Sequence, residues 1–114
     1  SSGRTIYIAG LIGWNEKENF ESDKLTDQFR TTLENIVAVL TVDGAGPEHI
    51  VRMTWYITDK KEYLSNLKEM GSIYRDVMGK NFPAMACVEV SALMEDKAKI
   101  EIETTAVIEE PHNE

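Results

Sequence analysis

The sequence predicts a two-layer α+β domain in which two helices cover one face of a four-stranded mixed sheet. Two segments carry apolar residues at helical spacing, and four shorter runs are rich in β-branched and aromatic side chains. Their order along the chain is strand, helix, strand, helix, strand, strand. Because each helix has a single apolar stripe, both helices are expected to pack on one side of the sheet.

The first strand and the longer helix occupy the N-terminal half. Residues 4–12 predict the strand, which Gly13 closes. Ser22 or Asp23 is expected to cap the following helix, and the glycines and proline of residues 44–47 are expected to end it. The apolar stripe of this helix consists of Leu25, Phe29, Leu33, Ile36, Val37 and Leu40.

The C-terminal half contains the other helix and three strands. Residues 50–57 predict a strand, and residues 59–79 predict one helix with Gly71 as its weak point, since glycine costs about 1 kcal/mol there relative to alanine. The last two strands are expected at 84–93 and 98–108 as an antiparallel hairpin. The connections that pass through helices are expected to be right-handed and to join parallel strands, which makes the sheet mixed.

Length and composition indicate one domain over residues 1–114, with residues 110–114 as a loose tail. The net charge of −8 repels phosphate backbones, so no nucleic acid partner is expected. No apolar run reaches the roughly 18 residues of a membrane span, and no signal peptide is recognisable, so no membrane partner is expected.

Cysteine and histidine usage argues against a disulfide and against a metal site. Cys87 is the single cysteine, and one of the two histidines, His112, lies in the polar tail. We therefore expect no metal and no other cofactor, and a reducing cytoplasmic location. The uncovered face of the sheet is expected to carry apolar residues such as Trp55 and Val88, which favours a homo-oligomer.

Three stretches carry a resemblance to a known family: RTIYIAGLIG at 4–13, IVRMTWYITDKKEY at 50–63 and FPAMACVEVSALMEDKAKIEIETTAV at 82–107. Together they resemble the reactive intermediate deaminase (Rid) family, also called YjgF or L-PSP endoribonuclease-like. The resemblance implies a chorismate-mutase-like subunit, a homotrimer and ligand clefts between neighbouring subunits. The family's first strand and its tyrosine, which precede this segment in other members, are absent from the sequence, so an incomplete cleft is expected.

The same resemblance implies a chemistry and a set of site residues. Better-known members hydrolyse small reactive enamines and imines to a 2-keto acid and ammonia. By position, Glu101 would orient the attacking water as the catalytic residue. Gly10, Ala86 and Cys87 would line the substrate cleft, and Trp14 would lie at its rim.

Met85 is the main departure from the family pattern. It occupies the position of the arginine that clamps the substrate carboxylate, and a thioether has no donor to replace a guanidinium. Ala9 and Gly71 replace two further polar residues of the family. Poor activity on the usual 2-imino acids is therefore expected, with Met85 lining a more apolar cleft. Arg52 is a candidate replacement cation, although an ordinary solvated strand residue is the favoured interpretation.

Other interpretations remain open for each of these features. Glu101 alternates with apolar neighbours and would, without the resemblance, be an exposed strand carboxylate. Cys87 is interpreted as a small cleft-wall residue rather than a nucleophile, because no histidine lies near it in the sequence. At the level of function, the alternative is a noncatalytic trimer that binds a small metabolite or a protein. An L-PSP-type endoribonuclease or translation inhibitor is a weaker alternative, because it conflicts with the acidic charge.

Overall fold

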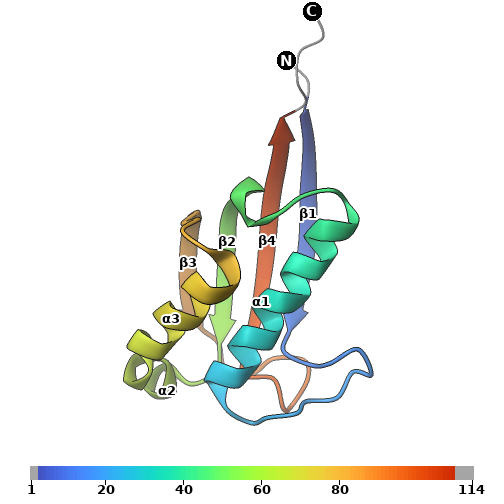
Figure 1. The fold of residues 1–114 in the computed structure, drawn as a ribbon. Helices are drawn as coiled ribbons and strands as arrows, with labels where there is room; N and C mark the ends of the chain where they lie inside the picture. Colours follow the sequence, from blue (N-terminus) through green and yellow to red (C-terminus); the bar gives the residue numbers. More distant parts are fainter. Residues whose placement is uncertain (1–2, 110–114) are drawn as a thin grey trace, which may run out of the picture.

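The computed structural model describes residues 3–109, in which two main helices lie on one face of a four-stranded sheet (Figure 1). The predicted α+β fold class is confirmed; the expected tail at 110–114 lies outside the described residues. None of the helices within 3–109 is long and apolar enough to cross a membrane. The elements are β1 (Gly3–Ile12), α1 (Leu25–Val42), a 3₁₀ turn (Pro47–His49), β2 (Ile50–Ile57), α2 (Lys60–Ser65), α3 (Leu67–Met78), β3 (Ala84–Glu89) and β4 (Ile100–Glu109).

Helix α1 forms because its apolar stripe faces the sheet. The stripe is buried as predicted, with only Val37 partly exposed. The predicted cap from Ser22 or Asp23 is wrong. The residue at the N-cap position of α1 is Lys24, and its side chain makes no capping hydrogen bond. Instead, the backbone N–H of Leu25 donates to the Glu62 carboxylate at 2.8 Å, and the other oxygen of that carboxylate accepts from Lys99 Nζ at 2.7 Å. The start of α1 is thus held by a carboxylate from α2.

The predicted second helix is divided in two, and the division lies at Asn66 rather than at Gly71. Asn66 leaves the helical conformation with φ −125° and ψ 22°, and its side-chain Nδ2 donates to the Glu62 carbonyl oxygen at 2.7 Å. An asparagine side chain that bonds the local backbone competes with the helical ladder. Gly71 lies inside α3, where it leaves an uncovered patch of helix surface.

The strand order is β1-β4-β2-β3, so the predicted hairpin between the last two strands is wrong. Strand β3 pairs only with β2, in parallel as predicted, and β4 lies between β1 and β2, antiparallel to both. Because β3 ends at Glu89, residues 90–99 form the link to β4. A link of this length passes β2 easily, since neighbouring strands are about 4.8 Å apart.

The two faces of the sheet differ in character. The helix-covered face holds the core, and Trp55 belongs to this face, where it is 6% exposed. The expectation that Trp55 lies on the uncovered face is therefore wrong. Along β2 the alternating buried positions are Met53, Trp55 and Ile57, so Trp55 points toward the helices. Val88 and Tyr7 are exposed, and their alternation along β3 and β1 places them on the uncovered face.

Candidate functional site

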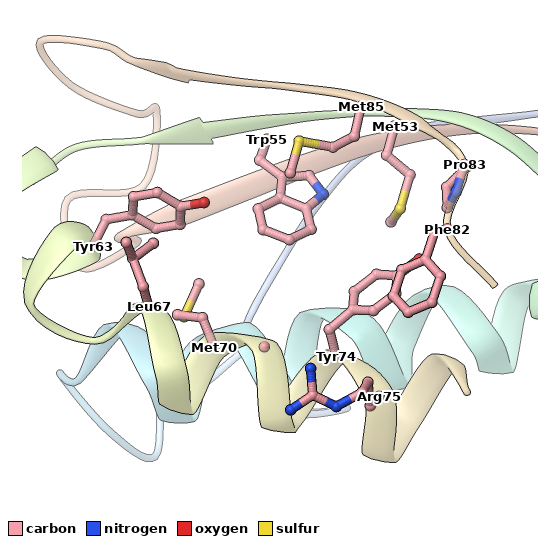
Figure 2. Close-up of a pocket in the computed structure, with 11 residues that line it drawn as sticks. Met53, Trp55, Tyr63, Leu67, Met70, Tyr74, Arg75, Phe82, Pro83 and Met85 are labelled. Carbon is pink, nitrogen blue, oxygen red and sulfur yellow. The ribbon is translucent and has the colours of Figure 1, made fainter. Parts of the chain in front are cut away.

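A cavity of about 260 Å³ lies between α3 and the β2–β3 edge of the sheet (Figure 2). Its walls come from β2, α2, α3, the segment that leads into β3 and β3 itself. Trp55 and Tyr74 have ring centroids 6.1 Å apart, and Phe82 stacks on Tyr74 at 5.8 Å. The pocket is lined by Met53, Trp55, Tyr63, Leu67, Met70, Gly71, Tyr74, Arg75, Phe82, Pro83 and Met85.

Met85 forms part of the wall of this pocket. It pairs in register with Met53 of β2, and Met53 is fully buried on the helix-covered face. Side chains at matched positions of neighbouring strands share a face, so Met85 projects toward the helices. It is 45% exposed because β3 is the edge strand. An apolar thioether thus stands where the resemblance places a carboxylate-binding arginine.

Cys87 lies on the same face, two residues further along β3, and is half-buried. Burial raises the pKa of the Cys87 thiol, and a hydrogen bond with the Tyr63 hydroxyl offsets part of this rise. At neutral pH the group is therefore a protonated thiol, which is a weak nucleophile. This geometry fits a wall residue of the pocket better than a covalent catalyst.

The titration of Cys87 gives a prediction that one reagent can check. With the pKa of the thiol raised by burial, the rate of iodoacetamide alkylation is expected to rise with pH and to reach its midpoint above the ordinary value for a cysteine thiol. Tyr63→Phe removes the hydrogen bond that stabilises the thiolate and is expected to move this midpoint further upward. Tyr7→Phe, on the other face of the sheet, is the matched control. A midpoint below pH 8 in the unmodified chain would contradict the prediction.

Glu101 and Gly10 form a second cluster, on the uncovered face of the sheet. Ile100 and Ile102 are fully buried beneath the helices, so Glu101 between them points the opposite way. A Cβ atom added at Gly10 would clash with the carboxylate of Glu101. The carboxylate therefore rests directly on the Gly10 backbone, beside an irregularity in the β1–β4 register between Ile8 and Leu11.

The predicted site residues are thus separated within one chain. The sheet lies between the Glu101–Gly10 cluster and the pocket that contains Met85. Trp14 belongs to neither group, since it packs against Phe20 at 5.9 Å and lines a separate hollow with the loop around Met94. One small ligand cannot contact Glu101 and Met85 of the same subunit.

The remaining candidates lie away from the pocket. Ala86 is exposed and, one residue along from Met85, faces the uncovered side of the sheet. Arg52 lines a hollow on that side with Tyr7 and Glu103, so it offers no cation to the pocket of its own chain. Within residues 3–109 no three metal-ligating side chains gather into a cluster.

Arg75 is a charged residue of the pocket that the sequence did not single out. It lies one helical turn after Gly71, and its Nη1 is 3.4 Å from the point where a Gly71 Cβ would be. The spacing of a glycine and an arginine four positions apart on one helix was the available signal, because such residues are neighbours on the helix surface.

An edge pocket on a four-stranded sheet covered by helices on one face defines a small α+β protein with a ligand-sized cavity. The family model described as Endoribonuclease L-PSP matches residues 1–108. The Escherichia coli K12 protein named "Putative reactive intermediate deaminase TdcF" is 35% identical over 105 residues, which cover 92% of this chain and 80% of that protein. The chain therefore belongs to the L-PSP, or Rid, family.

Solved structures agree with this assignment. The Rid-family protein YyfB from Yersinia pestis superposes with a TM-score of 0.81 at 33% identity, covering 92% of this chain and 79% of that one. The structure of E. coli TdcF with bound serine gives a TM-score of 0.78 at 28% identity and covers 92% and 81% of the two chains. The family and fold expected from the resemblance are confirmed.

Proposed function

We propose that this protein is a homotrimeric, cytoplasmic enamine or imine hydrolase whose substrate is not one of the usual small 2-imino acids. The observation that carries the proposal is the close approach of Glu101 to Gly10, because the absence of a side chain at Gly10 leaves room for a carboxylate against the uncovered face of the sheet. The name of TdcF as a reactive intermediate deaminase supports the same class of reaction.

The separation of the two clusters supports an assembled site. Glu101 of one subunit would meet the Met85 pocket only when a second copy lays its uncovered sheet face against the edge strand β3 of the first. The exposed Tyr7 and Val88 favour such coverage, since apolar surface of this kind commonly marks an interface. In this arrangement each cleft takes its water-positioning group and its binding pocket from different copies.

The chemistry requires little beyond a positioned carboxylate. A protonated imine is already electrophilic, so Glu101 needs to orient a water and accept its proton as the oxygen adds to the imine carbon. The Glu101 carboxyl then returns this proton to the nitrogen of the resulting carbinolamine, the C–N bond breaks as ammonia leaves, and the hydroxyl loses its proton to give the ketone. An enamine reaches the same imine by protonation of its carbon. No metal or redox group takes part in these steps.

Met85→Arg tests the proposal directly. Imines are generated from alanine and leucine with an amino-acid oxidase, and ammonia release is followed at fixed protein concentration. The unmodified chain is expected to act poorly on these 2-imino acids, and Met85→Arg is expected to raise kcat/KM at least roughly tenfold, because a charge-assisted hydrogen bond contributes about 1.5–3 kcal/mol.

The matched control for this gain is Met94→Arg. Met94 is 94% exposed in the link between β3 and β4 and lies outside the pocket, so the same substitution there is expected to change nothing. A wild-type rate already equal to that of Met85→Arg would contradict the substrate restriction. Ammonia release that neither protein accelerates over the rate without protein, for any imine, would favour the noncatalytic metabolite-binding alternative.

A further inference from the structure

Two residues that line the Met85 pocket, Trp55 and Arg75, carry hydrogen-bond donors that have no partner in the described part of the chain. The indole Nε1 of Trp55 is buried without an acceptor, although the pocket runs along its ring. Figure 2 shows this nitrogen on the side of the indole that is turned toward Met53. A buried donor left without an acceptor is uncommon in folded proteins and calls for an explanation such as a missing ligand.

Arg75 is the second unpartnered donor. Its guanidinium forms no ion pair within residues 3–109, whereas Arg30 on the neighbouring helix is paired with Asp76 at 2.6 Å. Figure 2 shows the Arg75 side chain lying along α3 at the edge of the pocket. Gly71, which also lines the pocket, lies beside the guanidinium: a Cβ atom at Gly71 would be 3.4 Å from Nη1, an ordinary van der Waals contact.

The pocket between these donors is apolar and large enough for a ring. Its volume of about 260 Å³ exceeds the roughly 150 Å³ that suffices for benzene in an apolar cavity. The rings of Trp55, Tyr74 and Phe82 supply flat surfaces, on which an aromatic or branched body packs well. An anionic group on such a body is suited to the guanidinium at the rim.

We infer that the pocket binds a monoanion with a one-ring or branched apolar body, and that Arg75 holds the anionic group. This inference deepens the proposed function, because it names the class of substrate for the same pocket. The inference also fits Met85. The positive charge that the resemblance places at this position of β3 is supplied instead by Arg75 of α3. A carboxylate next to the reacting carbon is then not required, and an anionic group further along the molecule is accepted.

Three probes of the full chain test the charge and the body separately. Isothermal titration calorimetry compares 3-phenylpropanoate with its neutral amide and with propanoate, which lacks the ring. The acid is expected to bind roughly tenfold or more tightly than either of the others. Arg75→Gln is expected to reduce its affinity to that of the amide, and Lys68→Gln, which removes an exposed cation from the same helix, is expected to leave it unchanged.

Nuclear magnetic resonance of the two tryptophan indoles gives a second readout. Binding of 3-phenylpropanoate is expected to shift the Trp55 indole N–H resonance and not that of Trp14, with Trp14→Phe providing the assignment. Equal affinities for acid and amide, no effect of Arg75→Gln, or a shift at Trp14 alone would each overturn the inference. Acid-selective binding in a chain that hydrolyses no imine would contradict the proposed hydrolysis while upholding the ligand class.

Discussion

Glu101→Gln is expected to lower kcat/KM for imine hydrolysis by about 10²- to 10⁴-fold, the range that a positioned general base contributes. Glutamine keeps the size of the side chain, so the contact with Gly10 is retained and the fold is expected to be unchanged. What is lost is the ability to accept a proton from the attacking water. The affinity for a nonreactive ligand should therefore stay within about twofold of the original value.

Glu103→Gln is the matched control for this prediction. Glu103 lies on the same strand and the same face, two residues further along, and accepts a hydrogen bond from the Tyr56 hydroxyl at 2.8 Å. Both variants remove one negative charge from the uncovered face, so a general electrostatic effect would appear in both. Ammonia release that falls equally in the two variants would show that Glu101 has no special role in water activation.

The helices and strands could be predicted because their signals are local. The apolar stripe of α1 repeats within a few residues, and the strand at 50–57 was placed correctly by its β-branched and aromatic content. The cap of α1 could not be predicted in the same way. Its carboxylate comes from Glu62, which lies 37 residues after Leu25, and no spacing rule connects the two.

The order of the strands was predicted only in part, because a short connection was assumed between the last two. Strand β4 is central, and its helix-facing residues from Ile100 to Ala106 are almost completely buried. A central position needs neighbours on both edges, which β1 and β2 supply. The alternation of residues 100–106 indicated a strand with one buried face but did not identify its partners.

The candidate site shows a similar division between local and distant information. Alternation along one strand was enough to place Glu101 opposite Ile100 and Ile102, and in the structure it also puts Met85 and Cys87 on a common face. It did not reveal that these faces belong to different sides of one sheet, because that depends on the register between strands. Arg75 was not singled out because its place at the edge of the pocket depends on how α3 packs over β2 and β3, which no local pattern encodes.

Gln28 is the least predictable contributor to stability. Its side chain is only 1% exposed although glutamine is usually a surface residue. The Nε2 group donates to the carbonyl oxygens of Ser22 and Lys97 at 3.0 and 2.9 Å, and Oε1 accepts from the backbone N–H of Lys99 at 2.8 Å. One side chain thus joins the start of α1 to the segment that leads into β4.

Gln28→Ala is therefore expected to lower the free energy of unfolding by about 3 kcal/mol, since it removes three part-buried hydrogen bonds and each contributes about 1 kcal/mol net. Urea unfolding followed by circular dichroism measures this at a fixed chain concentration, because association also shifts apparent stability. Thr31→Ala, on the exposed side of the same helix, removes a single hydrogen bond to the Asp27 carbonyl and should cost less than about 0.5 kcal/mol. Similar losses in the two variants would mean that water replaces the Gln28 amide, and that the link between α1 and β4 depends on apolar packing instead.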